Sequence, residues 1–193
     1  MIKQYSGAKA ERRTSREPLP VGGYVAKILA AQVQNYDFGD MLALSFDISE
    51  GQYKDFFKKD YAANQNEDKK WRGVFRVSIP KDDGSEKDAW SKAAFNDMIA
   101  VFEADPGFHW DWDETKLKGR TVGVLFRNKE WEWDGRTGWT TECCALTTAA
   151  EIRNGDFKMP KDKPLKHKTE SATATSSGFT AFTADEDDGT LPF

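Results

Sequence analysis

Apolar and polar residues alternate along much of the chain, which is the pattern of half-buried β-strands. Residues 24–34 are rich in Val, Ile, Ala and Leu and predict a first strand. Residues 41–48 predict a second strand, whose apolar face consists of Leu42, Leu44, Phe46 and Ile48. Turn-forming residues at positions 35–40 separate the two strands, so we expect a hairpin.

Three further strands follow from the same pattern. Residues 71–79 predict a third strand, which Pro80 ends. Residues 120–133 and 138–146 predict a fourth and a fifth strand, joined by a reversal that begins at Asp134 and Gly135. Residues 51–70 mix aromatic residues with lysines, and we interpret them as a long, partly helical connection.

One segment, from Asp88 to about residue 103, has apolar residues at convincing helical spacing. Ser85 or Asp88 can cap its start, and Pro106 with Gly107 ends it. Its apolar stripe comprises Trp90, Ala94, Phe95, Met98, Ile99, Val101 and Phe102. Trp90 is therefore expected in the core, as is Trp71, which lies on the apolar face of the third strand.

The predicted order is strand, strand, strand, helix, strand, strand. This is the order of an OB-fold, a five-stranded Greek-key barrel with one helix between its third and fourth strands. We therefore predict an all-β domain with one helix at residues 20–158, preceded by an arm at residues 1–19. A β-sandwich and an α+β roll are the alternatives, and fold order alone implies no function.

Composition adds a boundary at the C-terminal side of this domain. The chain has 193 residues, of which 38% are hydrophobic and 31% charged, which fits one core with unpacked appendages. Hydrophobic periodicity stops near Pro160, so residues 159–184 are predicted to be a disordered linker. The sequence has neither a long apolar run nor an apolar N-terminal segment, so we expect no membrane span, no secretory signal and a cytoplasmic location.

Charge is distributed unevenly along the chain. The formal net charge is −4, and residues 185–188 are all acidic. Without these four residues, acidic and basic side chains balance, and basic residues predominate in the N-terminal arm. The negative net charge therefore does not exclude a nucleic acid as the partner.

The sequence contains no recognisable catalytic motif. Asp111, Asp113 and Glu114 offer carboxylates that could hold magnesium, but their spacing matches no dedicated motif and favours a solvated loop. Cys143 and Cys144 are adjacent and have no histidine nearby, which argues against a disulfide framework, a zinc site or a nucleophile. We therefore expect no enzymatic activity, metal or cofactor.

Aromatic residues make up 13% of the chain and include seven tryptophans, too many for all to lie in the core. On the predicted fourth strand, Val122, Val124 and Phe126 form an apolar face that belongs inside. The opposite face alternates cations with rings, and consists of Arg127, Lys129, Trp131 and Trp133. Binders of single-stranded nucleic acid use this combination, because cations follow the phosphates and rings stack on unpaired bases.

We therefore predict that this face binds single-stranded DNA without sequence specificity. The residues that could extend its track are Arg72, Arg76, Trp139, Tyr53, Lys54, Lys58 and Lys59. The alternative is that Trp131 and Trp133 pack under the N-terminal arm or in the interface of a homo-oligomer, where tryptophan is also favoured. The pattern does not decide between core and surface for Trp110 and Trp112.

Residues 185–193 form the most specific local signal. Acids precede an apolar end, and the final Phe offers both a ring and the terminal carboxylate. This arrangement resembles the C-terminal tip of bacterial single-stranded DNA-binding proteins. The resemblance implies that replication, recombination and repair proteins dock on Asp185, Glu186, Asp187, Asp188, Leu191, Pro192 and Phe193. A solubilising tail would explain the acids but not the apolar end.

The rest of the chain resembles the divergent single-stranded DNA-binding proteins of phages and prophages. The resemblance covers about residues 20–155 and is most recognisable at residues 19–24. It implies a function in phage DNA replication and recombination inside a bacterial host cell, and leaves the oligomeric state open. Two other functions stay possible: an OB-like adaptor that recruits proteins through its tail without binding DNA, and a phage nuclease or recombination enzyme.

Overall fold

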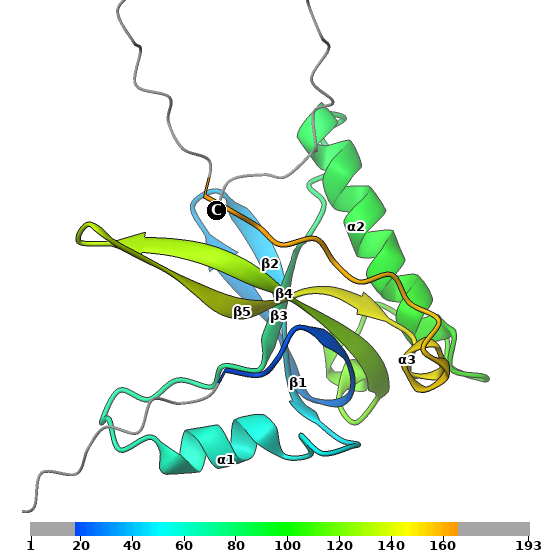
Figure 1. The fold of residues 1–193 in the computed structure, drawn as a ribbon. Helices are drawn as coiled ribbons and strands as arrows, with labels where there is room; N and C mark the ends of the chain where they lie inside the picture. The colour runs from blue at the N-terminus through cyan, green and yellow to red at the C-terminus, as the bar shows by residue number, and fades with distance from the viewer. Residues whose placement is uncertain (1–17, 166–193) are drawn as a thin grey trace, which may run out of the picture.

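The computed structural model describes residues 18–165, which form a five-stranded antiparallel sheet with three α-helices (Figure 1). The strands are β1 (Gly22–Tyr36), β2 (Gly39–Ile48), β3 (Val74–Ser78), β4 (Thr121–Trp133) and β5 (Arg136–Thr147). The helices are α1 (Phe56–Ala63), α2 (Glu86–Glu103) and α3 (Ala149–Asn154), and a 3-10 turn, η1 (Glu114–Leu117), precedes β4. All five predicted strands and both predicted hairpins are confirmed.

The strand order is β3-β2-β1-β4-β5, so β1 is the central strand. Residues 22–27 of β1 pair with β4, and β1 pairs with β2 from Ala26 onward. A bulge between Ile28 and Ala30 lies near the point where β1 leaves β4, and a bulge bends and twists its strand. The edge strands β3 and β5 contact each other, but within residues 18–165 no ladder of hydrogen bonds joins them. The sheet is therefore open.

The hydrophobic core lies on the sheet face that alternation predicts. The buried side chains of this face include Leu42, Leu44, Phe46, Ile48, Val122, Val124 and Phe126. Helix α2 covers them with Phe95, Met98 and Phe102. Leu19 is 2% exposed and belongs to the same core, so the segment predicted as a separate arm enters the domain at this residue.

The structure has three α-helices where the fold prediction had one: α1 lies within residues 51–70, which were interpreted as partly helical, and α3 was not predicted. Ser85 caps α2 by accepting a hydrogen bond from the Asp88 backbone N–H at 3.1 Å. Helix α3 begins with a capping box of Thr148 and Glu151, a signal that the sequence contains. Among residues 18–165, no helix combines the length and the apolar character that crossing a bilayer requires.

The N-terminal cap of helix α1 is supplied by a side chain of strand β2. The Asp47 carboxylate accepts hydrogen bonds from the backbone N–H groups of Phe57 and Lys58, at 2.9 and 3.1 Å. These groups lie in the first turn of a helix, where no intrahelical acceptor exists. Because Asp47 lies in β2, no local signal at residues 51–70 marks the start of this helix.

The prediction of Trp90 in the core is wrong. Its side chain is 56% exposed. The buried side of α2 carries Phe95 and, seven residues before it, Asp88. Trp90 lies off this side. Trp71 does pack against the core, and its indole N–H donates to the Phe46 carbonyl oxygen at 3.0 Å. Trp110 is buried, whereas its neighbour Trp112 is exposed.

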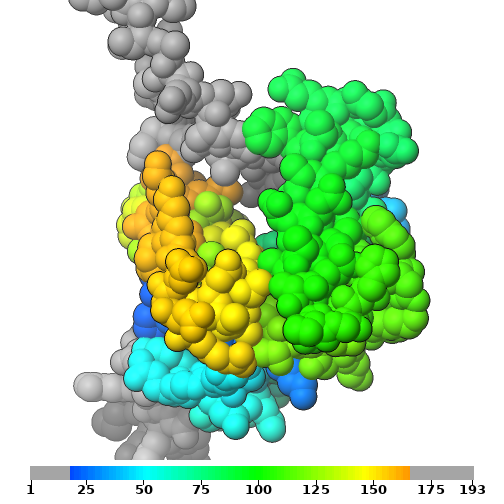
Figure 2. All heavy atoms as spheres, turned by 90° about the vertical axis from the view of Figure 1, so that its right-hand side faces the viewer, coloured from blue at the N-terminus to red at the C-terminus, as the bar shows by residue number. Residues whose placement is uncertain are grey.

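Residues 159–165, which we call the strap, lie partly along β4. The Lys163 N–H donates to the Asn128 carbonyl at 2.8 Å, and its own carbonyl accepts from the Glu130 N–H at 2.9 Å. In Figure 2, α3 and the strap (yellow to orange) lie beside α2 (green) on one face of the molecule. The domain therefore extends beyond the predicted boundary at residue 158. The rest of the predicted linker, from residue 166, lies outside the described residues.

Candidate nucleic-acid interface

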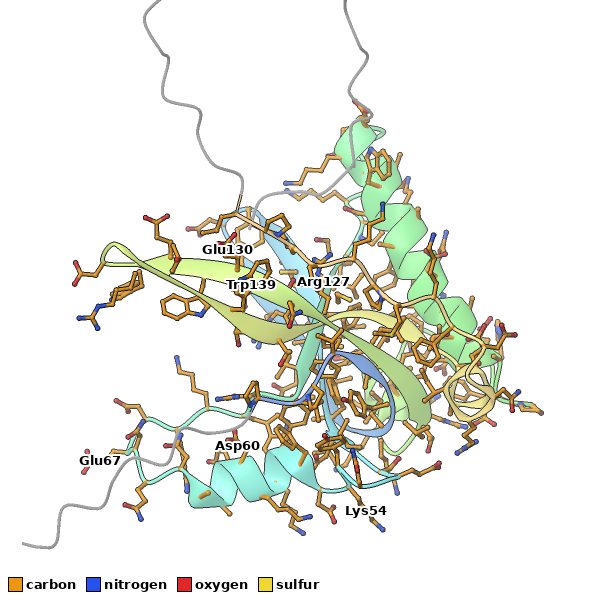
Figure 3. The ribbon with its side chains drawn as sticks, viewed as in Figure 1. Lys54, Asp60, Glu67, Arg127, Glu130 and Trp139 are labelled. Atoms are coloured by element: carbon orange, nitrogen blue, oxygen red, sulfur yellow. The ribbon has the colours of Figure 1, made fainter. Side chains whose placement is uncertain are left out.

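A groove of about 760 Å³ lies between the turn that joins β1 to β2, strand β3 and the base of the β4–β5 hairpin. Its apolar lining residues include Met41, Phe56, Phe57 and Val74. Its cationic lining residues are Arg72, Arg76, Lys129 and Lys163. Figure 3 shows the hairpin that carries Arg127 and Trp139 projecting above α1, which carries Asp60. Residues distant in sequence thus share one surface.

Two aromatic rings of the turn between β1 and β2 line this groove. Tyr36 and Phe38 stack with their centroids 5.0 Å apart and their planes 12° apart. Both side chains are exposed, and the Tyr36 hydroxyl donates to Gln34 Oε1 at 2.8 Å. These two residues were not predicted as ligand contacts, although two aromatic residues in a short polar turn are a signal of exposed rings in the sequence. They offer a surface on which unpaired bases can stack.

Strand β3 and the segment before it bring two predicted cations to the groove. Arg76 donates through Nε to Gln34 Oε1 at 3.3 Å. Arg72 Nε lies 3.5 Å from Asp60 Oδ2, so a carboxylate of α1 already compensates part of its charge. Both arginines line the groove, as the track predicted from sequence requires.

The β4–β5 hairpin carries its predicted cations and rings on one face. Arg127, Lys129, Trp131 and Trp133 lie opposite Glu142, Thr140, Gly138 and Arg136 of β5. Side chains directly opposite one another share a face, and this face is the reverse of the core face of β4. Trp131 is 40% exposed and Trp133 is 78% exposed, so neither is buried by the described residues. Of the four, Lys129 lines the groove and the rings lie farther along the same strand.

Gly138 gives the Trp131 ring its place on the hairpin. A Cβ atom at position 138 would lie 2.7 Å from Trp131 Cζ2, so the indole rests directly over the glycine. Trp139 lies opposite Glu130 and therefore points to the other face from Trp131. Sequence reasoning extended the track to Trp139 across the turn, and the register separates it from the other two tryptophans.

A carboxylate occupies the middle of the cationic stretch. Glu142 Oε1 lies 3.0 Å from an Arg127 Nη atom, and Glu142 Oε2 lies 3.0 Å from Lys129 Nζ. Burial raises the pKa of Glu142, but the hydrogen bonds from Lys129 and Arg127 outweigh burial and hold this pKa below its ordinary value. Glu142 is thus ionised at neutral pH, and the track carries less positive charge than its cations alone suggest.

The remaining residues of the predicted track do not line the groove. Tyr53 packs its ring at 90° against Tyr24, with centroids 5.6 Å apart, and borders the core. Lys54, Lys58 and Lys59 lie on α1 or just before it, and Lys59 Nζ donates to the Lys54 carbonyl at 2.8 Å.

The other candidate sites have local structural roles. Asp113 caps η1 by accepting from the Thr115 N–H at 3.0 Å, and Asp111 pairs with Lys116. Within the described part of the chain, no three acidic, histidine or cysteine residues are grouped to hold a metal ion. Burial raises the pKa of the Cys143 thiol, which disfavours the reactive thiolate.

The acidic C-terminal tip predicted from the sequence, residues 185–193, lies outside the described residues, as does most of the basic N-terminal arm. In comparisons with known proteins, no family model matches the chain. No curated protein matches it either.

Proposed function

We propose that this chain binds single-stranded DNA in the groove and along the Trp131 face of the β4–β5 hairpin. The observation that carries the proposal is the position of the groove on the sheet. It lies beside β2 and β3, between the turn that follows β1 and the hairpin that joins β4 to β5. In OB-folds, this face and these two loops bind oligonucleotides and oligosaccharides.

An OB-fold assignment, which belongs to the proposal, is supported by topology. In the barrel of an OB-fold, β1 lies between β2 and β4, and β3 meets β5 to close the barrel. The chain has the order β3-β2-β1-β4-β5, contact between β3 and β5, and α2 between β3 and β4. A barrel that is partly open between β3 and β5 places the groove at this opening.

The chemistry of the surface favours single strands over duplex. Tyr36 and Phe38 in the groove lining and Trp131 and Trp133 on the hairpin present exposed rings, and each stacked base contributes about 1–3 kcal/mol. Bases in a duplex are already stacked on one another. Arginine and lysine side chains beside these rings suit phosphates, which carry no sequence information. Binding is therefore sequence-tolerant.

The acidic tip adds a second part to the proposal. A partner with an apolar slot and a basic clamp would take the Phe193 ring and the terminal carboxylate together. The four preceding acids would speed encounter with a basic rim. Together with the resemblance to phage and prophage proteins, this supports a role in protecting single-stranded DNA and recruiting replication, recombination and repair proteins.

An adaptor that does not bind DNA is the second candidate. One observation favours it: Asp60 and Glu142 compensate three cations of the predicted track, Arg72, Arg127 and Lys129. A surface with little net positive charge attracts phosphates weakly.

Titration of the full chain with fluorescein-labelled oligo-dT separates the two candidates. The same titration with a duplex of equal length, at one stated salt concentration, is the control. We expect saturable binding to oligo-dT with quenching of tryptophan fluorescence, weaker binding to duplex, and loss of affinity as salt rises. Duplex binding as tight as single-strand binding would contradict the proposal, and no binding to either would favour the adaptor. Metal-dependent degradation of the oligonucleotide would instead indicate an enzyme.

A further inference from the structure

The cations of the hairpin are held by a carboxylate of their own sheet. Glu142 faces Arg127 directly across the β4–β5 ladder, and Lys129 lies two residues farther along the same face. Arg127 reaches Glu142 Oε1 through two nitrogens, at 3.0 and 3.1 Å, while Lys129 takes Oε2 at 3.0 Å. Both oxygens of one carboxylate are therefore engaged by the two cations.

The environment makes the pair of Arg127 and Glu142 stronger than an ordinary surface pair, while Lys129 is 37% exposed. The side chains of Arg127 and Glu142 are 21% and 25% exposed. Partial exclusion of water lowers the screening of these two charges, so the carboxylate competes effectively for Arg127, and its second oxygen pairs with Lys129. A phosphate oxygen would use the same donors, since guanidinium and ammonium groups bind carboxylate and phosphate in similar geometry.

We propose that Glu142 is a built-in competitor of the DNA phosphate, which lowers the affinity of the groove for single strands. The inference rests on the proposed binding of single-stranded DNA. Arg127 and Lys129 can bind a phosphate fully only by giving up Glu142, so the three side chains supply the net charge of one cation.

This role differs from a purely structural one. In the part of the chain that the structure describes, the hydrogen bonds of the Glu142 carboxylate go to Arg127 and Lys129, and none supports a helix end or a turn. Removing its charge therefore frees the two cations without removing a backbone contact. The sheet pairing of residue 142 is made by its main chain and stays.

The test compares Glu142→Gln with Glu132→Gln in the full chain. Glu132 lies on the same hairpin, is exposed, and points to the opposite face, so its substitution removes the same charge without freeing these cations. Oligo-dT binding is measured over a salt series. We expect Glu142→Gln to bind about 5- to 10-fold tighter at about 50 mM salt, because one more phosphate is neutralised. Its plot of log K against log salt should be steeper by about 0.7, and Glu132→Gln should match the natural chain.

A third variant ties the effect to the two cations. In a chain with Arg127→Gln and Lys129→Gln, adding Glu142→Gln should no longer raise the affinity. Thermal melting of each variant identifies any that does not fold, and the salt slope of the folded variants remains a separate readout.

Two outcomes overturn the inference alone while the natural chain binds oligo-dT: equal affinities and slopes for Glu142→Gln and Glu132→Gln, or weaker binding by Glu142→Gln. The second would make Glu142 a positioning residue for the cations. If no variant binds oligo-dT, the proposed function and this inference are both overturned.

Discussion

Exposed aromatic rings occur at several places on this molecule, and their neighbours give them different roles. Tyr36 and Phe38 line a groove that Arg72 and Arg76 also line, and Tyr36 and Arg76 both donate to Gln34 Oε1. Trp133 stands beside cations on the hairpin, whereas Trp90 lies on α2. Exposure alone therefore does not mark a ligand-binding ring. The proposal assigns stacking to the rings next to the groove and to the hairpin face.

Substitution of these rings should affect DNA binding selectively. Phe38→Ala, Trp131→Ala and Trp133→Ala should each weaken oligo-dT binding by about 1–3 kcal/mol, because each removes a stacking surface. Trp90→Ala is the matched control: it removes an exposed ring that does not line the groove and should leave the affinity unchanged. Fluorescence anisotropy at fixed salt measures the affinity of each variant for oligo-dT. Equal losses in all four variants would contradict the assigned site.

Stability should depend on a buried ring and not on the exposed ring of Trp90. Phe102 is fully buried under the sheet, so Phe102→Ala should lower the free energy of unfolding by about 3–5 kcal/mol through the cavity it leaves. Trp90→Ala should change this free energy by less than about 1 kcal/mol, because its ring is largely in water. Urea unfolding followed by circular dichroism provides the comparison. A large loss of unfolding free energy in Trp90→Ala would show that the Trp90 side chain packs in the core.

At the scale of elements, the strap is the segment whose position is hardest to infer locally. It adds backbone hydrogen bonds to the edge of β4 beyond the point where β1 ends its pairing. The Leu165 N–H also donates to the Glu130 carboxylate at 2.9 Å. These bonds cover a strand edge that would otherwise present unpaired groups. The strap also brings Lys163 to the groove.

Truncations on either side of the strap should separate its contribution from that of the tail. A chain ending at Leu165 should keep the unfolding free energy of the full chain. A chain ending at Lys158 should lose about 1–2 kcal/mol, since each lost hydrogen bond contributes about 0.5–1.5 kcal/mol net and the freed segment regains entropy. Faster amide exchange at Glu130 in the shorter chain would locate the loss. Identical stability of both truncations would show that the strap does not stabilise β4.

For the whole molecule, the relevant feature is the uneven distribution of charge along the sequence, with four acids at residues 185–188. The four acids at residues 185–188 account for the net charge of −4. Acids tethered to the domain can compete with phosphates for cations at low salt, where screening is weak. The tail and the groove are therefore coupled through charge in the proposed function.

Removing the tail should test this coupling and the role of the tip. Deletion of residues 166–193 should tighten oligo-dT binding modestly at low salt, and the gain should vanish at high salt. Deletion of Phe193 alone should leave DNA affinity unchanged but abolish pull-down of replication or recombination proteins, because the ring is lost and the carboxylate moves to Pro192. Retention of every partner after Phe193 deletion would reduce the tail to a solubilising appendage.

The sequence by itself determined the strands and their inward faces. Apolar and polar residues alternate at residues 41–48 and 120–133, which indicates that one side of each strand is buried. This can be recognised from neighbouring residues alone. It also predicted the shared face of Arg127, Lys129, Trp131 and Trp133, because side chains in a strand alternate with period two. Helix α2 and its Ser85 cap were likewise readable from local spacing.

The tertiary structure decided which of these faces meet. The N-terminal cap of α1 comes from Asp47 in β2, and the groove joins Tyr36 to Arg72 and Lys129. Such contacts depend on the order and coiling of the strands, which residue spacing does not encode. The pairing of Glu142 with Arg127 depends on the β4–β5 register after a bulge near Leu125. A shift of one residue there would turn the carboxylate to the other face, because successive side chains of a strand point to opposite sides.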